Sequence, residues 1–492
     1  MQENVHRRAT LTISAHAFKK YSGVPAAETG ALDGNGPAHP TESAARRKNG
    51  ENFLAAHSEN GKLCALSQTQ NFVAMNHPFI SAEKANELAE KFGTPIYVYD
   101  EKTLRASAAA CLAFPNAFGL TVRFAMKACP TAAVLRLFLS LGLHFDASSV
   151  YEVLRAMKAG VPAEKISLST QELPENFAEI IRLGIRFNAC SLDQLERFGN
   201  AFPRARVGVR FNPGTGSGAT GKTNVGGPDS SFGIWFEYAD AVDAILKKHG
   251  LVLERIHTHI GSGSDPAVWQ KAAIASLGVV RRFESVETLD FGGGFKVARV
   301  AGEKTTDLQT CGAPVRDAVA KLAAETGRRL HFEIEPGTRL VANAGAILAR
   351  VQDVVDTGAS GRKFIKLDSG MTDLLRPSLY GAQHPIFLAK KRGRAVPAET
   401  EKYVVVGHCC ESGDLVSCAP GEAETLAARE LPRAERGDFC IIGGAGAYCA
   451  SMSAKNYNSF PESAEVLLEE NGSARLIRRR QTLEQIIQNE LP

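Results

Sequence analysis

The chain has 492 residues, of which 44% are hydrophobic and 22% are charged, and its formal net charge is +4 at pH 7. This composition is typical of a globular protein with two or three domains, and the small charge excess does not favour nucleic acid or a membrane surface as a partner. No run of about 18 apolar residues occurs, so we expect no transmembrane helix. Ten cysteines without a Cys-x-x-Cys pair favour a reducing compartment such as the cytoplasm over a disulfide scaffold.

Residues 1–74 differ from the rest of the chain. They include ETGALDGNGPAHPTESAARRKNGEN, which is rich in small, polar and charged residues and has no apolar period. This composition predicts a disordered N-terminal extension. A transit peptide is the alternative and would place the protein in a plastid, but the six acidic residues of the segment are unusual in such peptides.

Eight short runs rich in Val, Ile, Phe and Thr follow, and each has the length of a buried strand. The segments between them have helical spacing; one of them places Val150, Val153 and Met157 on one face and stops at Gly160. Strands and helices that alternate eight times predict a (β/α)8 barrel, with a doubly wound open sheet as the main alternative. The runs are residues 122–128, 144–148, 166–170, 186–191, 206–213, 255–262, 288–295 and 331–337.

After residue 363 the sequence becomes β-rich, with little helical spacing, as in KYVVVGHCC and GDFCIIGGAGAYCASM. This texture predicts a separate β domain of the barrel or sandwich type. We therefore place the (β/α)8 barrel at residues 105–365 and the β domain at residues 366–492.

Polar residues and glycines gather at the carboxyl ends of the predicted strands, where such a barrel holds its active site. A lysine there can form a Schiff base if desolvation lowers its pKa, and the alternative is an ordinary surface lysine. Three successive glycines let backbone N–H groups approach a phosphate, although many such runs are only tight turns. The residues are Lys127, Asp146, His259, Ser262, Gly292, Gly293, Gly294 and Glu335.

Glu335 and the two histidines of HTHIG complete the pattern. The carboxylate of Glu335 could keep a pyridine nitrogen protonated; the alternative is an exposed glutamate at a strand end. His257 and His259 share one face of a strand. A zinc pair would lack further ligands at a suitable spacing, so stacking of one histidine on a ring is favoured and no metal is expected. A lysine, a phosphate cradle, a flat side chain and an acid together are typical of a pyridoxal 5'-phosphate site.

The stretch GHCCESGD, residues 407–414, contains the adjacent cysteines Cys409 and Cys410. A metal site again lacks partner ligands. A disulfide between these neighbours would be strained, because adjacent side chains of a strand leave opposite faces. The same alternation predicts that one thiol faces a site and the other faces away.

Several motifs resemble the barrel-type pyridoxal-phosphate-dependent decarboxylases, and among them the diaminopimelate decarboxylases. They are RFAMKA, HTHIGSG, FGGGF, EPG, LLRPSLYGAQH, CESGD and GAYCASMSAKNYNS, and the resemblance runs from about residue 90 to the C-terminus. It implies conversion of meso-2,6-diaminopimelate to L-lysine and carbon dioxide, the last step of lysine biosynthesis. Alternatives are decarboxylation of ornithine, lysine or arginine, and a cofactor-binding homologue without catalysis.

The resemblance also implies a role for each matching residue. Lys127 would carry the cofactor, and Cys410 would be the proton donor, which leaves Cys409 as a packing residue. The other cofactor contacts would be His259, Ser262, Gly292, Gly293, Gly294, Glu335, Gly337, Thr338 and Tyr448. The substrate contacts would be Arg339, Arg376, Tyr380, Glu411 and Tyr448. The β domain, joined by residues 75–104, would complete the barrel site of a second subunit, so a homodimer is implied.

One departure from the family concerns the substrate. Relatives usually read EPGR, whose arginine helps to grip an anion, whereas this chain reads EPGTRL. Thr338 therefore holds the position of that arginine, and Arg339 is its neighbour. Because adjacent strand residues point in opposite directions, the resemblance does not establish that Arg339 replaces it.

Overall fold

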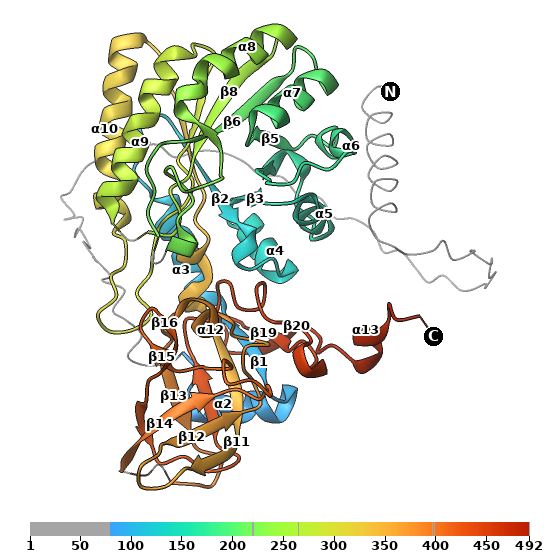
Figure 1. Ribbon diagram of the computed structural model, residues 1–492, viewed down its shortest axis with the longest axis vertical. Coiled ribbons are helices and arrows are strands. Elements are labelled where there is room, and N and C mark those ends of the chain that lie inside the picture. The colour runs from blue at the N-terminus through green and yellow to red at the C-terminus, as the bar shows by residue number, and fades with distance from the viewer. Residues whose placement is uncertain (1–78, 219–220, 264, 396, 398, 492) are drawn as a thin grey trace, which may run out of the picture.

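The computed structural model describes residues 79–491 apart from 219, 220, 264, 396 and 398, so the extension expected over residues 1–74 lies outside the described residues. The described chain forms a parallel barrel and a β-rich domain that lies against one end of it (Figure 1). None of the helices in this part of the chain is long and apolar enough to cross a membrane.

The barrel contains the eight predicted strands, and every neighbouring pair is parallel. β5 pairs with β6 and β10 pairs with β2, so the sheet closes on itself and the open-sheet alternative is wrong. The strands are β2 (Leu120–Ala125), β3 (His144–Ala147), β4 (Ile166–Leu168), β5 (Arg186–Ala189), β6 (Arg206–Asn212), β8 (Val252–Thr258), β9 (Thr288–Asp290) and β10 (His331–Ile334). A short strand, β7 (Ile234–Trp235), pairs with the end of β6.

Helices cover the outside of the barrel, as Figure 1 shows. α5 illustrates how the sequence sets their ends: the Ser149 side chain accepts the N–H of Glu152 at its start, and Gly160 follows its end with a φ of 96°. Its buried face includes Val150 and Val153, as the spacing predicts. The helices are α3 (Glu101–Leu112), α4 (Ala132–Ser140), α5 (Val150–Lys158), α6 (Phe177–Ile181), α7 (Leu192–Ala201), α8 (Ala239–His249), α9 (Pro266–Arg282) and α10 (Leu308–Thr326).

The β domain is built on a second sheet that takes strands from both ends of the described chain. β1 pairs antiparallel with β11 and parallel with β19, so the segment before the barrel joins this domain. The strands are β1 (Ile96–Asp100), β11 (Gly345–Asp356), β12 (Lys363–Leu367), β13 (Ile386–Ala389), β14 (Thr400–Val406), β17 (Arg429–Pro432), β18 (Phe439–Ile442), β19 (Ala464–Leu468) and β20 (Ala474–Arg478). The sequence-based boundary at residue 365 falls within this sheet, because β11 already belongs to it.

Shorter elements complete the β domain and its contact with the barrel. α2 packs its apolar face, including Leu88, on the same core as Ile96 and Val466 of the sheet. These elements are α2 (Ala82–Phe92), α11 (Thr338–Val341), α12 (Arg376–Tyr380), α13 (Leu483–Ile487), β15 (Cys418–Ala419) and β16 (Glu422–Leu426).

A buried ion cluster lies inside the barrel, below the ends of the strands. Glu333 on β10 accepts hydrogen bonds from Arg123 on β2, at 2.7 and 2.8 Å, and from Arg255 on β8, at 3.1 Å. All three side chains are at most 1% exposed. Burial opposes the ionisation of Glu333, but the two arginines outweigh it and lower the pKa of Glu333 to about 2. The cluster therefore ties three strands together through one carboxylate.

Replacing Glu333 with glutamine should lower the free energy of unfolding by about 3–5 kcal/mol, because the buried arginines lose their counter-charge. Urea denaturation followed by circular dichroism measures this change. The matched control is Glu325→Gln, which removes the exposed partner of Arg281 and should leave the denaturation midpoint near that of the unaltered protein. Equal midpoints for the two variants would contradict the role of the cluster.

Candidate active site

The candidate active site is a cavity of about 690 Å³ between the carboxyl ends of the barrel strands and the β domain. Most of the side chains and glycines expected at the site line it. On the barrel side these are Lys127, His259, Ser262, Gly293, Gly294, Glu335, Gly337 and Thr338, and on the β-domain side Arg376, Tyr380 and Tyr448. The cavity is not lined by Gly292, Arg339, Cys410 or Glu411.

Lys127 reaches the cavity because β2 ends at Ala125 and the chain turns into a short 3-10 helix, Met126–Ala128. Its Nζ lies 3.9 Å from Oδ2 of Asp146, and its side chain is 37% exposed. Burial would lower the pKa of Lys127, but Asp146, Tyr448 and Glu335 together outweigh burial and the pKa is raised. The lowered pKa considered from the sequence is therefore not found, and the surroundings favour the charged amine.

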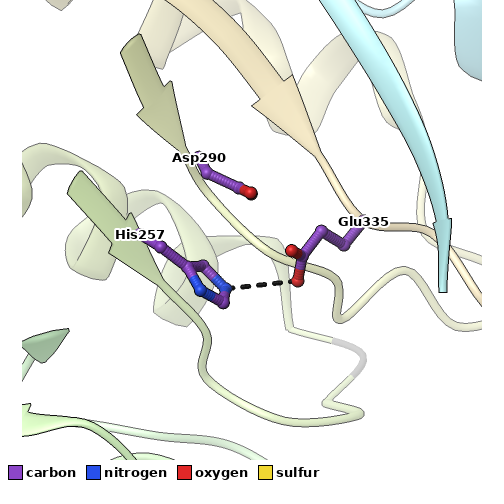
Figure 2. Close-up of side chains that lie close together, drawn as sticks. All are labelled: His257, Asp290 and Glu335. Carbon is purple, nitrogen blue, oxygen red and sulfur yellow. Dashed lines mark ion pairs between the residues drawn. The ribbon is translucent and has the colours of Figure 1, made fainter. Parts of the chain in front are cut away.

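Glu335 follows β10 directly and is 4% exposed. Its Oε2 lies 3.2 Å from Nε2 of His257 on β8, and Figure 2 shows the two side chains pointing toward each other. Burial would raise the pKa of Glu335, but the basic side chains around it, His257 first, hold that pKa well below its usual range. Oε1 is buried and has no hydrogen-bond partner among the described residues. A carboxylate oxygen in this state fits the protonated nitrogen of a pyridine ring.

His257, Asp290 and Glu335 offer ligand atoms within 4.8 Å of one another, as a metal site would (Figure 2). Oδ1 of Asp290, however, accepts the N–H of Gly292 at 2.9 Å. Burial and the neighbouring Glu335 raise the pKa of Asp290 well above its usual range. A protonated carboxyl is a poor cation ligand, so the cluster suits a ring nitrogen better than a metal ion.

The glycines after β9 let the chain pass close to the ends of β8 and β10. A Cβ at Gly293 would lie 2.7 Å from the carbonyl oxygen of Glu335, and one at Gly294 would lie 3.1 Å from that of Gly261. Gly293 and Gly294 therefore present bare backbone to the cavity, beside Ser262, as a phosphate group requires. Gly292 lies outside the cavity, where its carbonyl accepts the N–H of Glu335.

The ring of His259 lines the cavity beside these glycines. The N–H of Gly293 donates to Nδ1 of His259 at 3.1 Å, which makes Nδ1 an acceptor. Burial lowers the pKa of His259 well below its usual range, and Arg210 and Lys127 lower it further. The imidazole is therefore neutral, and a neutral flat ring is suited to stacking on another ring.

Tyr448 brings the β domain to the barrel. Its φ is 57°, in the left-handed region that residues other than glycine rarely adopt. Its N–H donates to the carbonyl of Ala128 at 2.9 Å, so the loop between β18 and β19 is fixed to the turn that carries Lys127. This strained backbone conformation occurs at the residue whose ring lines the cavity, Tyr448.

Arg376 and Tyr380 come from the short helix α12, and the Arg376 guanidinium lies 5.9 Å from the centre of the Tyr380 ring. Arg339 lies elsewhere, on α11, with Cys111 of α3 and Asp307 as its charged or titratable neighbours. The cavity thus receives Arg376 and Tyr380 but not Arg339.

Cys409 and Cys410 do not lie in a strand, so the alternation expected for them is wrong. β14 ends at Val406, and the segment that follows is a turn in which Asp414 accepts the N–H of Cys409 at 2.8 Å. Cys409 is half-buried, and burial, with Asp414 beside it, raises its pKa to about 12. Cys410 is exposed, and Glu411 lines a separate depression on the surface.

Sequence reasoning missed two arginines that line the cavity, Arg210 and Arg299. Arg210 is a charged residue inside the buried run RVGVRFN of β6, which is a signal that could have been used. Arg299 lies in the irregular segment between β9 and α10, where no periodic pattern indicates which way a side chain points.

Gly293→Ala should weaken the binding of pyridoxal 5'-phosphate, because the new methyl group collides with the backbone that positions Glu335. Titration of the cofactor-free protein, followed by absorbance, measures the affinity, and we expect a loss of about 10-fold or more. Gly278→Ala on the exposed face of α9 is the control, since a Cβ there meets nothing within 4 Å. Equal affinities for the two variants would exclude the close approach as a requirement.

Comparison with known proteins assigns the chain to a family. Residues 104–342 match the family model described as the pyridoxal binding domain of pyridoxal-dependent decarboxylases. The diaminopimelate decarboxylase of Escherichia coli K12 is 37% identical over 419 residues, which cover 84% of this chain and 97% of the relative.

Solved structures agree with the sequence match. A crystal structure of diaminopimelate decarboxylase superimposes with a TM-score of 0.77 at 37% identity, over 83% of this chain and 96% of the other. The enzyme from Helicobacter pylori, in complex with L-lysine, gives a TM-score of 0.73 at 28% identity, over 82% of this chain and 98% of the other. The chain belongs to the diaminopimelate decarboxylase family of pyridoxal-dependent decarboxylases.

Proposed function

We propose that the protein removes carbon dioxide from the D-configured centre of meso-2,6-diaminopimelate and releases L-lysine, the last step of lysine biosynthesis. The observation that carries this proposal is a single cavity that joins Lys127, His259 and Glu335 to an arginine and a tyrosine at its other side. The unpaired thiols among the described cysteines suit a reducing compartment, and we infer a cytoplasmic enzyme.

The cofactor of this family is pyridoxal 5'-phosphate, which supplies an electron sink for the electron pair left at the α-carbon when carbon dioxide departs. Lys127 is the amine placed to hold it covalently. Glu335 is ionised and presents an unpartnered oxygen, so it would keep the ring nitrogen protonated. The neutral His259 would cover one ring face, and Gly293 and Gly294 with Ser262 would receive the phosphate.

Arg376 and Tyr380 distinguish the proposed substrate from its rivals. Diaminopimelate carries a carboxylate beside the ammonium group at its far end, whereas ornithine, lysine and arginine carry only a cation there. A guanidinium group at the cavity wall attracts a carboxylate and repels a cation. This charge argument favours diaminopimelate over decarboxylation of a basic amino acid.

We further propose a homodimer in which each cavity is completed by the other copy. Cys410 and Glu411 match family positions for the proton donor and the amine contact, yet neither lines the cavity of its own chain. Cys410 is exposed, and its N–H donates to the Asn458 side chain at 2.9 Å, which fixes the turn in an outward position. Cys410 of the partner subunit would then protonate the α-carbon, and the partner's Glu411 would hold the far ammonium group.

The unaltered enzyme, supplied with pyridoxal 5'-phosphate and a panel of diamino acids, should release carbon dioxide from meso-2,6-diaminopimelate and form L-lysine. Chromatographic identification of the product makes the test. Lys127→Ala should lose both the cofactor absorbance of the lysine adduct and the release of carbon dioxide. Retention of both by this variant, or preferential turnover of ornithine, would refute the proposal.

Cys410→Ala should lower kcat by about 10²- to 10⁴-fold, the usual contribution of a general acid. Cys409→Ala is the matched control and should retain most of the activity, because its thiol packs beside Asp414. Steady-state kinetics of the two variants distinguish the residues. A severe loss for Cys409→Ala with a mild one for Cys410→Ala would reverse the assignment.

Mixing Lys127→Ala with Cys410→Ala tests the shared site directly. Each variant alone should be inactive, whereas random pairing of the subunits should restore about a quarter of the native sites. No recovery after subunit exchange, verified by a tagged partner, would contradict a site built from two copies.

A further inference from the structure

Arg299 is a buried guanidinium group on the wall of the cavity, five residues after Gly294, the last glycine of FGGG. It is 4% exposed, and its Nε donates to the carbonyl of Gly444 in the β domain at 3.0 Å. Its Nη2 is buried and has no hydrogen-bond partner among the described residues. A side chain held at one nitrogen and unsatisfied at another, beside a cavity, is placed to bind a ligand.

The β domain is shaped around this side chain. Gly444 has a φ of 64°, and a Cβ there would lie 2.9 Å from both Cγ and Cδ of Arg299. Glu303 fixes the other side of the residue by accepting its backbone N–H at 2.8 Å. Arg299 is thus held by the loop after β9 and by the turn after β18 together.

Arg299 has basic and acidic neighbours, and Arg376 acts on it most strongly. Burial, and then the charge of Arg299, lower the pKa of His384 well below its usual range. The Nε of Arg376 is buried and also lacks a hydrogen-bond partner among the described residues. Burial, and then the charge of Arg376, lowers the pKa of Arg299 to about 10, so it remains protonated at neutral pH. The carboxylate of Glu303 contacts the backbone N–H of Arg299 and the side chain of Lys296, and does not pair with the Arg299 guanidinium group.

No ion pair joins either guanidinium group to a carboxylate within the described part of the chain. Two cations that face one cavity in this way are costly unless an anion enters between them. A planar carboxylate matches the fork of a guanidinium group better than a spherical ion does. The ligand expected at this wall is therefore a carboxylate.

We propose that Arg299, with Arg376, binds the carboxylate that the substrate keeps, at the end remote from the bond that breaks. The inference rests on the proposed function and names the residue that performs the task assigned in relatives to the EPGR arginine. Arg339, the neighbour of that position in sequence, does not line the cavity. Arg299 reaches the same end of the substrate from a different loop.

Arg299→Gln should raise KM for meso-2,6-diaminopimelate by about 10- to 100-fold with a much smaller change in kcat, because a charged hydrogen bond remote from the chemistry is lost. Inhibition by L-lysine, which retains this carboxylate, should weaken by a similar factor. Inhibition by cadaverine, which lacks it, should not weaken. Arg299→Lys, which keeps the charge but not the fork, should give an intermediate KM.

Arg316→Gln, which alters an exposed arginine paired with Asp317, is the matched control and should leave KM unchanged. Unchanged cofactor absorbance establishes that each variant is folded and holds pyridoxal 5'-phosphate. If Arg299→Gln loses this absorbance, the comparison is made with Arg299→Lys instead. An unaltered KM and unaltered lysine inhibition in the Arg299 variants would overturn the inference, as would a rise in KM in Arg339→Gln alone. In those cases the native enzyme still converts diaminopimelate, which separates this failure from failure of the proposed function.

Discussion

The active site depends on the carboxylate of Glu333, which lies inside the barrel and not in the cavity. It holds Arg123 of β2 and Arg255 of β8 to β10, and the upper ends of these same strands carry Lys127, His257 and His259, and Glu335. Because the cluster ties β2, β8 and β10 together below the cavity, it adds to the backbone pairing that sets the heights of those strand ends relative to one another. The precise position of a catalytic group is thus determined one layer below it.

Glu333 on β10 and Glu335, which follows β10, are both ionised, but for different reasons. Glu333 is surrounded by permanent arginine charges, whereas Glu335 depends first on His257 and leaves one oxygen without a partner. Asp290, close to Glu335, is driven toward its protonated form by burial and by that charge. The barrel interior therefore concentrates one reactive negative charge where a ring nitrogen would lie, which is the arrangement that a buried electron sink requires.

The sequence was sufficient for the parts of the structure that periodicity controls. Each barrel strand was recognisable as an apolar run, and residues such as Lys127 and Glu335 follow at strand ends, where fold class alone predicts their position. Irregular segments were not predictable in this way. Spacing predicts a strand where residues 407–414 form a turn, because the hydrogen bonds to Asp414 that make the turn leave no periodic pattern. The residues of β11 resemble the end of the barrel in sequence, because their pairing partners β1 and β18 lie far away in the chain.

The same distinction between regular and irregular segments explains how a different arginine could bind the far carboxylate of the substrate in this member of the family. Arg339 lies on α11, and the packing of α11 against α3 keeps its side chain out of the cavity. A long irregular loop has no such constraint, and the segment between β9 and α10 can bring Arg299 to the cavity provided that the β domain leaves space for it. Gly444 provides that space. Most of the cofactor residues therefore follow directly after barrel strands, where the sheet fixes their position. The contacts to the far end of the substrate belong to irregular segments and to the second domain, where one guanidinium group can substitute for another.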